Sequence, residues 1–130
     1  MKRFASLVLA SLLLTTSVAW AKTIRVNFPP GKTSISLKGK TTGGPSESGG
    51  MDPIAYHVRA RKGQQMSLHL TSAKNNAVFG LYTPGMDLIE VGENATDWSG
   101  TLPKTGDYEI MVFPSDEATD TTFTLEVTIR

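Results

Sequence analysis

Two histidines are the first side chains of this 130-residue chain to consider for chemistry, because imidazole is a common metal ligand. His57 and His69 each stand between apolar residues of an alternating segment, so both are expected to point outward. A zinc site needs at least a third protein ligand at a suitable position. Asp52 is the nearest candidate in the sequence, and no spacing motif links it to the histidines. The pattern therefore predicts two surface histidines and no metal site.

Other ligand types are present without the spacing that a metal site needs. The acidic residues of the 87–97 segment lack the one-three-five spacing and bidentate glutamate of a calcium loop. Thioether sulfur suits monovalent copper, but the methionines of residues 22–130 are scattered, and Met66 stands where a strand would bury it. We expect no cofactor, and we interpret the acids as a solvated edge.

No catalytic residue is predicted either. No serine stands in a nucleophile-elbow context, and the chain has no glycine-rich phosphate loop. Counting acids does not exclude a paired-carboxylate hydrolase, but a small β-domain offers little room for a substrate cleft. The chain is therefore not expected to be an enzyme.

The segment 100–112 is the most informative, and it has two interpretations. Residues 103–106 form a tight turn, and a strand begins at Asp107. Tyr108, at the start of a strand after a Gly-Asp turn, is placed to close a β-sandwich corner through its hydroxyl. Alternatively, the loop protrudes and offers the Thr105 hydroxyl, backbone amides and the tyrosine ring to a partner. The two roles are compatible, and the residues alone do not separate them.

The elements that position these residues are strands, because apolar residues recur with a period of two. Alternation of this kind buries one face of each strand and exposes the other. Turn residues such as Pro29-Pro30-Gly31, Thr83-Pro84-Gly85 and Lys104-Thr105-Gly106 separate the alternating runs. The pattern predicts an all-β fold, an antiparallel β-sandwich of seven or eight short strands. The glycine-rich residues 41–51 are expected to form a surface loop.

The first 21 residues have the layout of a secretory signal peptide. A positive start at residues 1–3 precedes an apolar run at 4–14 and the small-x-small cleavage site Ala19-Trp20-Ala21. The apolar run is shorter than the ~20 residues of a membrane span. We expect export to the periplasm, removal of residues 1–21 and no membrane insertion. Residues 22–130, which are 130 − 21 = 109 positions without a cysteine, are expected to form one domain.

Charge is distributed unevenly along residues 22–130. Positions 22–74 carry nine basic and two acidic residues, and positions 75–130 carry ten acidic and two basic ones. Either strands from the two halves interleave and pair their charges, or an acidic end attracts a basic partner. The net charge of −1 (11 basic, 12 acidic) does not support phosphate binding, so nucleic acid is not an expected partner.

In sequence order, several elements resemble the small bacterial periplasmic inhibitors of g-type and i-type lysozyme. These elements are Val26-Asn27-Phe28 before Gly31-Lys32, the 56–64 segment with its Lys62-Gly63-Gln64 turn, the Thr83-Pro84-Gly85 turn, and Leu102-Pro103 before Gly106-Asp107-Tyr108. The similarity covers nearly all of residues 22–130. It implies a β-sandwich related to the bacterial pre-peptidase C-terminal domain.

The resemblance also implies a function and a site. Family members insert a Ser-Gly-x-Tyr loop into the lysozyme's active-site cleft, and the matching residues here are Thr105, Gly106, Asp107 and Tyr108. Thr105 keeps the hydroxyl group that serine provides at the first position of this loop. The implied partner is a host or phage lysozyme, with bacterial defence as the role and a homodimer left open. The chain departs from the family at 114–120, where acids replace an arginine-rich loop.

An alternative function belongs to a different class. A non-catalytic periplasmic β-sandwich module could bind carbohydrate or other cell-envelope components. Trp98 would then be a sugar-stacking platform if its ring is exposed. If the ring instead packs against the core, Trp98 has no such role.

Overall fold

The computed structural model describes residues 22–41, 53–92, 95–115 and 120–130, and within these ranges the chain forms β-strands and no helix. The expected signal peptide (1–21), nearly all of the expected glycine-rich loop and the candidate ligands Met51 and Asp52 lie outside the described residues. The strands are β1 (Lys22–Arg25), β2 (Ser34–Thr41), β3 (Ile54–Ala60), β4 (Gln65–Ser72), β5 (Ala77–Tyr82), β6 (Leu88–Ile89), β7 (Asp97–Thr101), β8 (Gly106–Pro114) and β9 (Thr121–Ile129).

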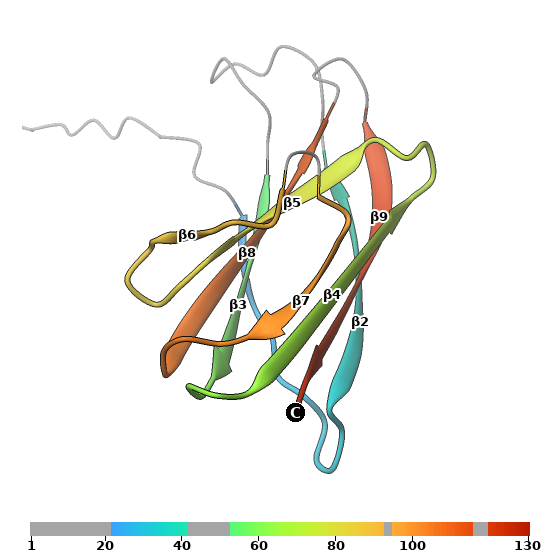
Figure 1. Ribbon diagram of the computed structural model, residues 1–130. Helices are drawn as coiled ribbons and strands as arrows, with labels where there is room; N and C mark the ends of the chain where they lie inside the picture. Colours follow the sequence, from blue (N-terminus) through green and yellow to red (C-terminus); the bar gives the residue numbers. More distant parts are fainter. Residues whose placement is uncertain (1–21, 42–52, 93–94, 116–119) are drawn as a thin grey trace, which may run out of the picture.

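The strands form two sheets that face each other as the layers of a sandwich (Figure 1). The five-stranded sheet has the order β1-β3-β8-β5-β6, and the four-stranded sheet has the order β2-β9-β4-β7. Neighbouring strands are antiparallel except that β1 runs parallel to β3. The predicted all-β sandwich is confirmed.

Alternation along most strands builds the core, as the period of two predicted, whereas five consecutive residues of β5 are buried. Inward side chains of both sheets meet in one buried cluster that includes Tyr56, Val58, Met66, Leu68, Phe79, Leu81, Ile110, Val112, Leu125 and Val127. The described residues form nine strands, where seven or eight were predicted. The alternating runs did not reveal β6 and β7, because β6 has two residues and β7 has glycine at one of its inward positions.

Charges from the two halves of the chain pair between strands of the same sheet. β3 pairs with β8, and β9 lies between β2 and β4 in the other sheet. Of the six ion pairs among the described residues, five join a residue before position 75 to one after it, as in Arg25–Asp107. Interleaving of strands, one of the two expectations, therefore accounts for the uneven charge distribution along the sequence.

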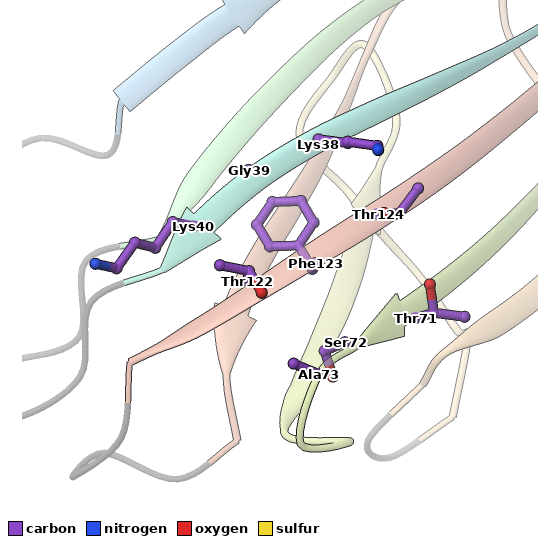
Figure 2. A pocket seen from close by; sticks show the side chains of 9 residues that line it. All are labelled: Lys38, Gly39, Lys40, Thr71, Ser72, Ala73, Thr122, Phe123 and Thr124. Carbon is purple, nitrogen blue, oxygen red and sulfur yellow. The ribbon is translucent and has the colours of Figure 1, made fainter.

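Gly39 of β2 has no room for a side chain, because two aromatic residues fill the space beneath it. The rings of Tyr56 and Phe123 meet edge to face across the two sheets, with centroids 6.3 Å apart. A Cβ atom on Gly39 would lie 2.7 Å from the Phe123 ring and 3.0 Å from the Tyr56 hydroxyl. Figure 2 shows the Phe123 ring beside Gly39. The absence of a side chain at Gly39 thus lets β2 pack closely against the rings of Tyr56 and Phe123.

We predict that Gly39→Ala lowers the free energy of unfolding by about 1 to 3 kcal/mol, because overpacking a filled core displaces its side chains. Urea denaturation followed by tryptophan fluorescence measures this change. Ser36→Ala, at an exposed position of the same strand, is the matched control and is expected to change stability by less than about 0.5 kcal/mol. Equal stability of Gly39→Ala and the wild type would contradict the packing argument.

Candidate functional site

The four residues predicted to contact a partner lie in and directly after one turn between β7 and β8. We call residues 103–107 the Thr105 turn. Thr105 and Asp107 are exposed, Gly106 is half-buried, and Tyr108 is fully buried at 0% exposure. The turn therefore presents three of the four residues at the surface. The idea that the Tyr108 ring is offered to a partner is wrong, because the ring lies in the core.

Tyr108 instead closes a corner of the sandwich, which was the structural interpretation of the sequence. Its hydroxyl donates a hydrogen bond to the Lys104 carbonyl oxygen (2.6 Å) and accepts one from the Lys104 backbone N–H (2.9 Å). The buried hydroxyl oxygen of Tyr108 thus forms hydrogen bonds with both the backbone N–H and the backbone C=O of Lys104. This arrangement fixes the path of the backbone immediately before Thr105.

The Thr105 hydroxyl is oriented by a neighbouring turn. Its Oγ1 accepts a hydrogen bond from the Lys62 backbone N–H (2.9 Å). The two loops are also joined by Gly63 N–H to Leu102 O (2.8 Å) and Leu102 N–H to Gln64 O (2.8 Å). Because the hydroxyl accepts this bond, its own hydrogen stays available to an external acceptor such as a carboxylate.

Gly106 lets the turn pack against a third loop. Its φ of +147° is a backbone conformation that favours glycine. A Cβ atom at this position would lie 2.9 Å from two side-chain carbons of Pro84. Lys104 and Asp87 add an ion pair between the same two loops, with 3.6 Å between Nζ and Oδ2. The Thr105 turn is therefore supported by the 61–64 and 83–87 loops together.

Asp107 is paired with two arginines. Its Oδ1 lies 3.0 Å from Arg25 Nη2 and 3.8 Å from Arg59 Nη1. The hydrogen bond from Arg25, with a further Coulombic contribution from Arg59, holds the pKa of Asp107 below its usual value. The carboxylate therefore remains ionised near neutral pH, and the nearby guanidinium groups compensate its charge.

A groove next to the Thr105 turn was not predicted from the sequence. Its volume is about 710 Å³, and we call it the basic groove, because four of its ten lining residues are Lys or Arg and none is Asp or Glu. It is lined by Phe28, Lys32, Thr33, Arg59, Ala60, Arg61, Gln64, Thr105, Ile129 and Arg130. These residues come from four separate segments (28–33, 59–64, 105 and 129–130), so only the folded chain brings them together.

The hydroxyl- and lysine-lined hollow in Figure 2 lies elsewhere. It has a volume of about 620 Å³ and is formed by residues 38–40, 71–73 and 122–124. These residues lie at the end of the four-stranded sheet opposite to Gln65, Thr101 and Arg130, which are next to the Thr105 turn. No Asp, Glu or His lines this hollow.

The two histidines do not meet. His57 lies on β3 and contacts Glu109 at 2.8 Å, whereas His69 lies on β4 of the other sheet and contacts Asp97. The hydrogen bond with Asp97 raises the pKa of His69 and lowers that of Asp97. Among the described residues, no three His, Asp or Glu side chains are grouped as metal ligands would be.

The Trp98 ring packs against the core and is not freely exposed. It is half-buried, and a Cβ atom on Gly100 would lie 2.5 Å from the ring. Because Gly100 leaves space for the ring, the packing interpretation describes Trp98 better than a sugar platform does.

Most of the acidic segment 114–120 lies outside the described residues, because residues 116–119 are not described. Pro114, where β8 ends, is about 26 Å from Gly106, where β8 begins within the Thr105 turn.

Comparison with known proteins confirms the suspected resemblance. The chain is similar to PliG of Aeromonas hydrophila, a periplasmic inhibitor of g-type lysozyme, with 27% identity over 85% of this chain and 97% of that one and a TM-score of 0.68. The fold is shared with PliG of Salmonella Typhimurium (24% identity, 85% and 99% covered, TM-score 0.63). It is also shared with a pre-peptidase C-terminal domain of Bacillus anthracis collagenase (15% identity, 85% and 96% covered, TM-score 0.57).

No protein-family model matches the chain, and no curated protein matches it. The part of the chain that the structure describes contains no helix that could cross a membrane.

We predict that Tyr108→Phe lowers the free energy of unfolding by about 1 to 3 kcal/mol, because two hydrogen bonds to the Lys104 backbone are lost. Tyr56→Phe is the matched control. The Tyr56 hydroxyl is buried with no hydrogen-bond partner among the described residues, so its removal is expected to be neutral or stabilising. Urea titration of both variants measures the difference. Equal effects of the two substitutions would contradict the role of the corner.

Proposed function

We propose that this chain is a periplasmic, non-catalytic inhibitor of lysozyme that blocks the enzyme's cleft with the Thr105 turn. The proposal includes export by the segment 1–21. The proposed partner is a host or phage lysozyme, with the g-type as the favoured class and the i-type as the alternative. The observation that carries it is the exposed Thr105, held on a braced turn of a sandwich that resembles the Aeromonas g-type inhibitor.

The chemistry of the partner suits such a turn. Glycosidases cleave between two carboxyl groups that flank the glycan, so a loop that occupies this space excludes the substrate. The Thr105 hydroxyl has a hydrogen to donate to one of these carboxylates. Since the hydroxyl is already oriented by Lys62, little conformational entropy is lost on binding.

Asp107 does not oppose entry into an acidic cleft. Its carboxylate is shared between Arg25 and Arg59, so this part of the turn carries no net negative charge. Tyr108 acts as a positioning residue, because it contacts the Lys104 backbone from inside the core and is not available to the partner.

We predict that the purified chain inhibits a g-type lysozyme at near-stoichiometric amounts, measured as slower clearing of a bacterial cell-wall suspension. Thr105→Val is expected to weaken inhibition about 10- to 100-fold, because a hydrogen bond to a charged group contributes about 1.5 to 3 kcal/mol. Thr105→Ser keeps the hydroxyl and should inhibit nearly as well as the wild type. Thr71→Val, on the exposed face of β4 at the opposite end, is the matched control and should change nothing.

Two results would contradict the proposal. If the wild type leaves g-type, i-type and c-type lysozymes fully active, the chain is not a lysozyme inhibitor. If it sediments with insoluble peptidoglycan yet inhibits none of them, the envelope-binding alternative replaces the proposed function. Equal inhibition by Thr105→Val and Thr105→Ser would show that the turn blocks the cleft without using its hydroxyl.

A further inference from the structure

We infer that the basic groove is a second contact site for the partner, and that it receives an acidic segment of the lysozyme from the rim of the enzyme's cleft. The inference rests on the proposed function, because the turn and the groove would meet the same enzyme. It assigns a role to residues of the 28–33 and 59–64 segments that neither the sequence pattern nor the Thr105 turn explains.

The groove carries positive charge that the described part of the chain does not compensate. Lys32 and Arg61 are exposed, and neither has a carboxylate partner within 4.0 Å among the described residues. Arg59 shares Asp107 with Arg25, so the two guanidinium groups together exceed the one carboxylate. Several unpaired cations around a concave surface produce a local positive potential that attracts anionic groups.

The floor of the groove favours a protein segment over a free anion. Phe28 is half-buried there, and Ala60 and Ile129, two buried core residues, also line the groove. An apolar floor with cations around it suits aspartate or glutamate side chains together with the aliphatic groups beside them. A protein interface of this kind has an apolar centre and a charged rim.

The groove is continuous with the Thr105 turn. Thr105 lines the groove, and its hydroxyl is bonded to Lys62, the residue that follows Arg61. This hydrogen bond fixes the distance between the turn and the groove before any partner arrives. An enzyme that receives the turn must therefore place the rim of its cleft against the groove.

The positive charge lies at the same end of the sandwich as the Thr105 turn. Lys32, Arg59 and Arg61 line one groove together with Thr105, so the turn and the cations face a partner from the same side.

Charge reversal in the groove tests this inference. Lys32→Glu and Arg61→Glu are each expected to slow association with the inhibited lysozyme about tenfold at low salt, because complementary charge accelerates encounter. The difference from the wild type should shrink between about 50 and 500 mM NaCl, since salt screens exposed charges. Surface plasmon resonance at several salt concentrations, together with the inhibition assay, measures both effects.

Lys74→Glu is the matched control, because it makes the same charge change on an exposed residue after the far end of β4. Association of this variant should remain within twofold of the wild type. If the wild type inhibits and both groove variants behave like Lys74→Glu, the groove inference is wrong and the proposed function stands. If the wild type inhibits no lysozyme, both are wrong. Unchanged melting temperatures show that the groove variants remain folded.

Discussion

The candidate site depends on the hydrogen bonds that the Tyr108 hydroxyl makes with the Lys104 backbone. This oxygen is buried beneath the turn, and it satisfies an N–H and a C=O that the tight reversal between β7 and β8 would otherwise leave to solvent. That contact fixes the backbone at Lys104. The contacts of Thr105, Gly106 and Asp107 with neighbouring segments hold the rest of the turn.

Much of the fold could be predicted because burial repeats with the period of a strand. Seven of the nine strands coincide with alternating apolar runs, and the inward residues of those runs form the core. β6 and β7 were missed for a local reason. Leu88–Ile89 is too short to show a period, and Trp98 alternates with Gly100, which contributes no hydrophobic side chain.

The site was only half predictable. The sequence singled out residues 105–108 as a candidate site and gave Tyr108 two possible roles, but choosing between these roles requires knowing which face of β8 it occupies. Tyr108 lies in phase with Ile110 and Val112, which are buried as it is. That phase was visible in the sequence and favoured an internal ring. The basic groove gave no such signal, because residues 28, 59 and 129 become neighbours only through the pairing of distant strands.

The place of β9 in the sheet has a consequence for how the protein folds. β9 is the final strand of the described chain, yet it lies between β2 and β4 in the four-stranded sheet. Until β9 is in place, β2 and β4 have no strand to join them, so the four-stranded sheet cannot form before both meet β9. Folds built on such distant pairings also form slowly, in milliseconds to seconds. We therefore expect the four-stranded sheet to form in one slow step that waits for β9.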